Sequence, residues 1–144
     1  GDEDFTVQVM PETVSKTNLK YKNIGSKLNL EPSLKVGDTL DGHLVMGHVD
    51  NVGVVQKVIS QKDWWTIDIL PPSELVRYIS KKGSVAINGT SLTVSNLGDD
   101  SSFEISLIKH TLENTNLGDL QPGNLVNIEV DMFARYIDKL NFQK

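Results

Sequence analysis

The sequence predicts an all-β protein built from small barrels, with few helices. Short stretches rich in β-branched and apolar residues recur, and glycine-, asparagine- and proline-containing turns separate them at intervals of roughly 8–12 residues. Phe5–Met10 alternates apolar and other side chains with the period of two that a half-buried strand requires. Asn88-Gly89 lies between two such stretches and predicts a tight hairpin turn. The expected strands are residues 5–10, 28–31, 44–49, 52–59, 64–70, 84–87, 91–96, 103–108 and 124–130.

Two segments carry helical patterns. Pro71-Pro72-Ser73-Glu74 predicts a helix start with Ser73 as its cap, and Gly83 is expected to end that helix. The second segment, residues 132–142, spaces its apolar residues as one face of an amphipathic helix. Those apolar residues are Phe133, Tyr136, Ile137 and Leu140.

Composition and charge exclude several classes of protein. The 144 residues include 14 Lys and Arg against 19 Asp and Glu, a net charge of −5, which argues against nucleic-acid or anionic-membrane binding. The absence of cysteine excludes disulfides, zinc ribbons and iron–sulfur clusters within this sequence. Without a membrane-length apolar run or a charged-then-apolar leader, a soluble cytoplasmic protein is expected.

The sequence contains an internal repeat. Residues 5–31 align without a gap on residues 103–129, at a constant offset of 98, and eight of the 27 positions are identical. Three consecutive identities, Thr17-Asn18-Leu19, make chance similarity an unattractive explanation. The chain is therefore expected to hold the second half of one barrel in residues 1–40, a complete barrel in residues 41–131 and a helix in residues 132–144.

Residues 42–50 hold two of the three histidines, His43 and His48, beside Gly42 and Gly47. In a regular strand the two histidines would face opposite sides, and too few further ligands exist for a metal site. Two alternatives remain. A histidine is held structurally by a backbone partner, or the flanking glycines let a histidine approach a ligand closely.

Hydroxyl groups follow the predicted Asn88-Gly89 turn. Ser91 and Thr93 are expected on one strand face, where they could bind a ring edge or polarise a water, or simply pair across strands. Since no G-x-S-x-G motif is present, a hydrolase serine is not expected.

Three other polar segments have open interpretations. Residues 110–113 and their repeat mates 12–15 predict Thr-capped turns that could bind a heterocycle edge or an anion, or act as ordinary helix caps. Asn127, Glu129 and Asp131 share one face of a predicted strand, which suggests more than a plain edge strand.

Taken together, these motifs resemble the two-barrel, trimeric riboflavin synthase family. The resemblance lies in GHLVMGHVDNVG (42–53), YISKKGSVAINGTSLTV (78–94), SLIKHTLENTNLGDLQPGNLVNIEVD (106–131) and PETVSKTNLKYKNIGSKLNLE (11–31). It implies tandem six-stranded Greek-key barrels, short helices and a C-terminal helix that helps to form a homotrimer. It also implies a cofactor-free reaction, in which one 6,7-dimethyl-8-ribityllumazine gives a four-carbon unit to another. The products would be riboflavin and 5-amino-6-(ribitylamino)uracil.

The resemblance also assigns roles to individual residues. His48, Ser91 and Asp131 would handle protons, and no metal is implied. Substrate would be bound by the residues that match the family's pocket. They are Gln8, Val9, Met10, Pro11, Glu12, Thr13, Gly47, His48, Val49, Lys82, Ser91, Leu92, Thr93, Ile108, Lys109, His110, Thr111, Leu112 and Glu113. The implied partners are the lumazine substrate, riboflavin, further copies of the chain and lumazine synthase.

The sequence departs from the family pattern at several points. Asn88 stands where Asp is usual, Lys109 stands where Pro is common, and the first half of the N-terminal barrel, with its Cys-Leu-Thr stretch, is not in this sequence. The chain is therefore not expected to close its first barrel, and a longer intact protein is expected. The alternatives to an enzyme are an antenna-type lumazine or flavin carrier and a fragment that only trimerises. The two histidines and Ser91-Leu92-Thr93 favour the enzyme.

Overall fold

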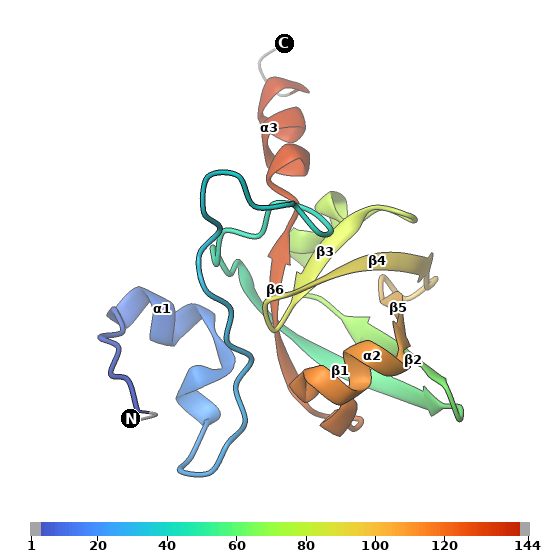
Figure 1. Ribbon diagram of the computed structural model, residues 1–144. Helices are drawn as coiled ribbons and strands as arrows, with labels where there is room; N and C mark the ends of the chain where they lie inside the picture. The colour runs from blue at the N-terminus through green and yellow to red at the C-terminus, as the bar shows by residue number, and fades with distance from the viewer. Residues whose placement is uncertain (1–3, 142–144) are drawn as a thin grey trace.

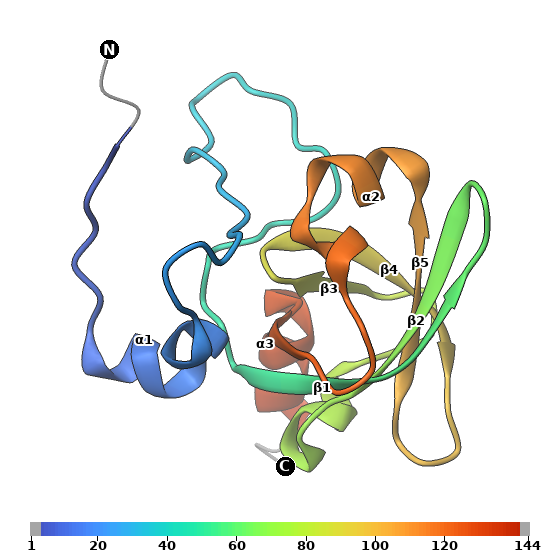
Figure 2. The same ribbon diagram turned by 90° about the horizontal axis from the view of Figure 1, so that it is seen from below.

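Six antiparallel strands form a closed barrel in the computed structural model, which describes residues 4–141. Around the barrel the order is β1-β2-β5-β4-β3-β6 (Figures 1 and 2). Hairpins join β3 to β4 and β4 to β5, whereas β2 lies beside β5 and not beside β3. This is a Greek-key arrangement. The predicted all-β barrel is confirmed. The strands are β1 (Asn51–Ser60), β2 (Trp64–Leu70), β3 (Ser84–Ile87), β4 (Thr90–Leu97), β5 (Phe103–Ile108) and β6 (Leu125–Val130).

The barrel interior is filled by alternate residues of each strand. In β5, Phe103, Ile105 and Leu107 are buried, while the residues between them are more exposed. Gly53 in β1 has no side chain because a Cβ there would lie 2.6 Å from the Ile128 side chain. The apolar residues that alternate in the sequence therefore form one continuous core.

The predicted hairpin turn at Asn88-Gly89 is confirmed. Asn88 has φ 48° and Gly89 has φ 81°, and Ile87 pairs with Thr90 across the turn. Positive φ at both central residues is the geometry of a type I′ turn, which matches the twist of the flanking strands.

The internal repeat is visible in the local structure. Helix α1 (Pro11–Lys16) and the 3₁₀ turn η1 (Asn18–Tyr21) match α2 (Lys109–Asn114) and η3 (Asn116–Asp119), each shifted by 98 residues. Thr17 and Thr115 accept the N–H of the residue two positions on, at 3.3 and 3.2 Å. The expected caps at residues 12–15 and 110–113 are wrong, since α1 and α2 have no side-chain cap and the capping threonines follow these helices.

Three expected strands are wrong: residues 5–10, 28–31 and 44–49 form no strand. The repeat mates of the first two lie in β5 and β6, which are held by hydrogen bonds to β1–β4. Among residues 4–50 no strand is available to make such bonds. Residues 44–49 instead form a loop, where Gly47 takes φ +73° and the Met46 N–H donates to the Glu129 side chain at 2.8 Å.

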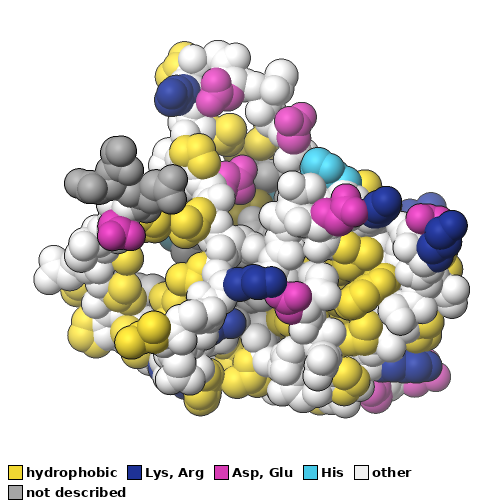
Figure 3. Space-filling model, turned by 60° about the horizontal axis from the view of Figure 1, so that its bottom comes forward, with side chains coloured by type: hydrophobic (Ala, Val, Ile, Leu, Met, Phe, Trp, Pro, Cys, Tyr) yellow, Lys and Arg dark blue, Asp and Glu magenta, His cyan; other side chains and the backbone are white. Residues whose placement is uncertain are grey.

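The unpaired N-terminal segment leaves apolar side chains in solvent. Phe5 and Val7 are each 65% exposed, and apolar atoms reach the surface on the left of the view in Figure 3, where this segment lies. Within residues 4–141, this strand-like sequence pairs with no strand and its apolar side chains are exposed.

The helix predicted after Pro71 is shorter and tighter than expected. It is a 3₁₀ turn, η2 (Ser73–Tyr78), capped by Pro72 without a side-chain bond, and it ends before Gly83. The Ile79 N–H donates to the Val76 carbonyl, which closes the turn while Leu75 enters the core. Ser73 is thus the first residue of the turn, and the expectation that it caps a longer helix is wrong.

The helix that the tail pattern predicts is confirmed as α3 (Met132–Asn141), and Phe142 lies outside the described residues. Helix α3 stands at one end of the barrel (Figure 1). Arg135 forms an ion pair with Asp50 at 2.7 Å, and the Tyr78 hydroxyl donates to Asp138 at 3.0 Å. The bond to Asp138 raises the pKa of Tyr78. These contacts fix the polar side of α3 to the barrel.

Candidate functional site

Ser91 forms a hydrogen-bonded pair with His43. Ser91 lies on β4 directly after the type I′ turn, and its Oγ is 2.7 Å from His43 Nδ1. The same Oγ accepts the backbone N–H of His43 at 3.2 Å. Gly42, at φ +100°, allows this approach, because a Cβ there would lie 2.4 Å from Ser91 Oγ. The loop and the hairpin therefore build the pair together.

The pair can transfer a proton. Since Ser91 Oγ already accepts the His43 N–H, its own hydrogen is available to donate to Nδ1. His43 Nε2 is buried without a hydrogen-bond partner among the described residues. An imidazole held in this way can serve as a general base toward the hydroxyl or toward a bound molecule.

A groove of about 1700 Å³ opens beside this pair. Its lining includes the segment 27–35, Gly89–Ser91 and Glu113–Asn116, together with His43. Ligand sites usually measure about 300–1000 Å³, so the groove has room for a drug-sized heterocycle with a polar chain. Of the predicted substrate contacts, Gly47, Ser91 and Glu113 line this groove.

The other predicted substrate contacts lie outside this groove. Gln8–Thr13 are exposed along the N-terminal segment and α1, and Ile108–Leu112 lie at the end of β5 and in α2. Lys82 is exposed in the turn before β3, and Leu92 packs against the core. Thr93 is exposed on β4, and Val49 is half-buried ahead of β1. Binding by these residues remains a prediction.

The two other predicted proton-handling residues are not bonded to Ser91 in the part of the chain that the structure covers. His48 is exposed, and its carbonyl accepts Arg135 Nη2 at 3.1 Å. Asp131 Oδ1 accepts the Phe133 N–H at 2.9 Å, at the start of α3. The sequence motifs favour His48 over His43, because only the path of the loop decides which histidine contacts Ser91.

The polar face predicted on β6 organises neighbouring segments. Asn127 Oδ1 accepts the Asn18 N–H at 2.7 Å, and the buried Glu129 carboxylate accepts the Met46 N–H. Each side chain therefore holds one chain segment against the barrel: Asn127 the first repeat, and Glu129 the loop that carries His43.

The described residues were also compared with the requirements of a metal site and of a membrane-spanning helix. Among residues 4–141 no group of three or more His, Cys, Asp or Glu side chains could hold a metal ion. In the same range, no helix combines the length and apolar character that crossing a bilayer requires.

Comparison with known proteins identifies the class of this barrel. The family model described as "Lumazine binding domain" matches residues 1–33 and 46–131. Two solved structures are similar. The structure of LumP complexed with riboflavin has a TM-score of 0.77 and 28% identity, over 83% of this chain and 64% of that one. The structure of LumP complexed with 6,7-dimethyl-8-(1'-D-ribityl) lumazine has a TM-score of 0.74 and 26% identity, over 84% of this chain and 64% of that one. The fold is thus that of a lumazine-binding domain.

Curated relatives narrow the class to one family. The chain is 42% identical to the riboflavin synthase of Mycobacterium bovis, over 96% of this chain and 70% of that protein. It is 41% identical to the riboflavin synthase of Brucella abortus, over 97% of this chain and 69% of that protein. The chain belongs to the riboflavin synthase family, as the motifs predicted. It spans about 70% of the length of these relatives and about 64% of the LumP chains.

Proposed function

We propose that this protein is a riboflavin synthase. Two molecules of 6,7-dimethyl-8-ribityllumazine would react, one giving a four-carbon unit to the other, to yield riboflavin and 5-amino-6-(ribitylamino)uracil. No external oxidant or reductant is needed, because one substrate molecule supplies what the other gains. The observation that carries the proposal is the Ser91–His43 pair in the lining of a large groove, in a chain 42% identical to a riboflavin synthase.

The proposed roles follow from the chemistry of the pair. The reaction needs a base that removes an acidic methyl proton and a group that activates a nucleophile at the ring. A neutral imidazole can take a proton near neutral pH, and the Ser91 hydroxyl beside His43 can lose or relay one. His48 and Asp131 remain proposed contributors on the strength of the family motifs.

The second candidate function is a carrier that binds a lumazine or flavin without turnover. It is favoured by the structural similarity to LumP, whose structures hold riboflavin and a ribityl lumazine. The identity to LumP is 26–28%, against 42% and 41% to the riboflavin synthases. The enzyme is therefore the better supported reading.

Turnover stoichiometry distinguishes these functions. Incubation of the chain with 6,7-dimethyl-8-ribityllumazine is expected to produce one riboflavin for every two substrate molecules consumed. Absorbance and chromatography would measure both compounds. Stoichiometric binding without riboflavin would assign the carrier function, and the absence of binding would overturn both.

We propose that the chain forms a homotrimer through α3. Its apolar face is exposed, with Phe133 58% and Ile137 60% accessible, although the opposite side is tied to the barrel by Arg135. An amphipathic helix held in this way suits contact with other copies of the chain. A cytoplasmic location and lumazine synthase as a partner are further proposals, which rest on the family resemblance.

Adding charge to this face is expected to dissociate the assembly. Ile137→Asp should convert an oligomer to a monomer, because an unpaired carboxylate would be buried in the interface. Light scattering coupled to gel filtration would measure the mass. Lys139→Asp, at an exposed polar position of α3, is the control and should keep the wild-type mass. An unchanged mass for Ile137→Asp would contradict an interface at α3.

A further inference from the structure

Two pairs of asparagines join the repeats reciprocally. The backbone N–H of Asn18 donates to Asn127 Oδ1 at 2.7 Å, and the backbone N–H of Asn116 donates to Asn29 Oδ1 at 2.7 Å. Asn18 and Asn116 are repeat mates, and so are Asn29 and Asn127, because each pair is 98 residues apart. The same bond is therefore made twice with the roles of the repeats exchanged, which is a local two-fold relation between the two halves.

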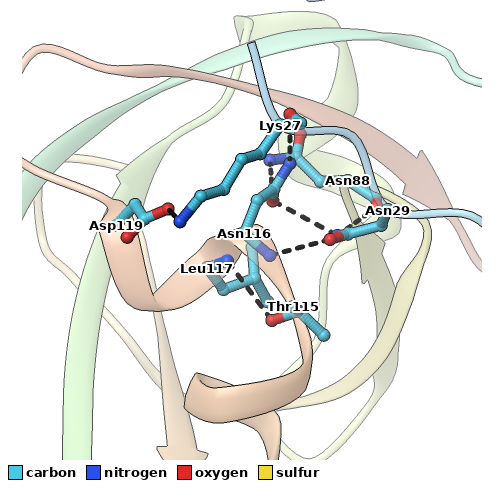
Figure 4. Close-up of polar contacts among 7 residues, drawn as sticks. All are labelled: Lys27, Asn29, Asn88, Thr115, Asn116, Leu117 and Asp119. Atoms are coloured by element: carbon cyan, nitrogen blue, oxygen red, sulfur yellow. Dashed lines mark hydrogen bonds and ion pairs between the residues drawn. The ribbon is translucent and has the colours of Figure 1, made fainter. Parts of the chain in front are cut away.

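Asn88 joins the two pairs at the hairpin. Its Oδ1 accepts the Asn127 N–H at 2.8 Å, and its Nδ2 donates to Asn116 Oδ1 at 3.1 Å. Asn29 Nδ2 in turn donates to the Asn88 carbonyl at 2.9 Å (Figure 4). An aspartate at position 88 would lack the donor toward Asn116, so this departure from the family pattern has a structural use here.

The joint is partly buried and reaches the groove. Asn18 is only 3% exposed, so its polar groups depend on these partners, and its Nδ2 also donates to the Leu125 carbonyl at 2.9 Å. Asn29 and Asn116, which contact each other, both line the groove itself. Ser91 lies three residues from Asn88 on the same hairpin.

We propose that these five asparagines (Asn18, Asn29, Asn88, Asn116 and Asn127, the asparagine joint) are positioning residues for the lumazine site. The joint holds the first-repeat wall of the groove at a set distance from the hairpin that carries Ser91. The first repeat thereby shapes the pocket of the second barrel in addition to supplying its own substrate contacts. This inference rests on the proposed function, because the lumazine is taken from it as the ligand. The effect of the joint on binding does not require that the protein turns the lumazine over.

The test compares three variants of the full chain with wild type. Asn29→Ala removes the oxygen that accepts the Asn116 N–H and the amide group that donates to the Asn88 carbonyl. Asn127→Ala removes the oxygen that accepts the Asn18 N–H. Asn127→Asp keeps an oxygen at that place and should restore the bond. Asn23→Ala is the control, since Asn23 is exposed and outside the joint.

Three quantities are measured: the Kd for 6,7-dimethyl-8-ribityllumazine by fluorescence titration, kcat with KM, and hydrogen exchange of residues 18–31. For Asn29→Ala we expect Kd and KM to rise about tenfold, with kcat within about threefold of wild type. Exchange of residues 18–31 should accelerate, while amides of the barrel core, such as Ile105, stay protected. Asn127→Ala should also accelerate exchange, and Asn127→Asp should return it close to wild type.

Two results would overturn the proposal. Faster exchange with unchanged Kd and KM would show that the joint holds the segment without shaping the pocket. Unchanged exchange in both alanine variants would show that these bonds do not hold the repeats together. If wild type binds the lumazine without turnover, the expected rise in Kd would still support the joint, and only the proposed reaction would fail.

Discussion

Replacing Ser91 by alanine is expected to lower kcat about a hundredfold while KM changes by less than about threefold. The variant loses the hydroxyl that lies 2.7 Å from His43 Nδ1, and with it a route for the proton. It keeps the backbone of the hairpin and the other lining of the groove, where we propose that the substrate binds. Initial rates of riboflavin formation over a range of substrate concentrations would separate the two constants.

Variants of the two histidines sharpen this prediction. His43→Gln should lower kcat about as much as Ser91→Ala, and the double variant should lose little more, because the two groups act as a unit. His48→Gln should lower kcat less than His43→Gln, since the structure pairs His43 with Ser91. Ser60→Ala, at the exposed end of β1, is the control. A normal kcat for both Ser91→Ala and His43→Gln would remove the pair from the mechanism.

Replacing Phe103 by alanine is expected to lower the free energy of unfolding by about 3–5 kcal/mol. Phe103 is 1% exposed in the barrel core, so its loss removes buried apolar surface and leaves a cavity. Single domains are stable by only about 5–15 kcal/mol, so the variant should unfold at much lower urea concentration. Urea denaturation followed by tryptophan fluorescence would measure the midpoint and the slope.

The repeat provides a matched control for this experiment. Phe5 occupies the same place in the first repeat but is 65% exposed, so Phe5→Ala should change the free energy of unfolding by less than about 0.5 kcal/mol. The same substitution at equivalent repeat positions is thus expected to be strongly destabilising at Phe103 and nearly neutral at Phe5. A loss for Phe5→Ala as large as that for Phe103→Ala would contradict the exposed placement of the N-terminal segment.

The sequence predicted well where structure forms from neighbouring residues or within the closed barrel. The Asn88-Gly89 turn and the register of the repeat were correct, because turn geometry depends on residues a few positions apart. The six barrel strands were also correct within a few residues. The motifs further identified the family, to which both the domain match and the curated relatives assign the chain.

The candidate site was predicted only in part. The predicted residue Ser91 lines the groove and pairs with His43, whereas the motifs favour His48, whose role stays a prediction. Alternation in residues 44–49 favoured a strand, but Gly42 and Gly47 bend this segment into a loop. Four asparagines of the joint are identities of the repeat, and Asn88 is a departure from the family pattern. Neither feature predicts that these residues contact one another.

The sequence alone predicted the six barrel strands, the Asn88-Gly89 turn, the register of the repeat and the family. Tertiary structure decided which strand-like segments become strands: Phe103 lies in β5, whereas its mate Phe5 remains extended and exposed. It also decided that His43 meets Ser91 and that Asn18 and Asn116 exchange bonds with Asn127 and Asn29. The physical reason is the same in each case. Helical turns close their hydrogen bonds within four residues, whereas strands, side-chain pairs and the joint need partners that only the folded chain brings together.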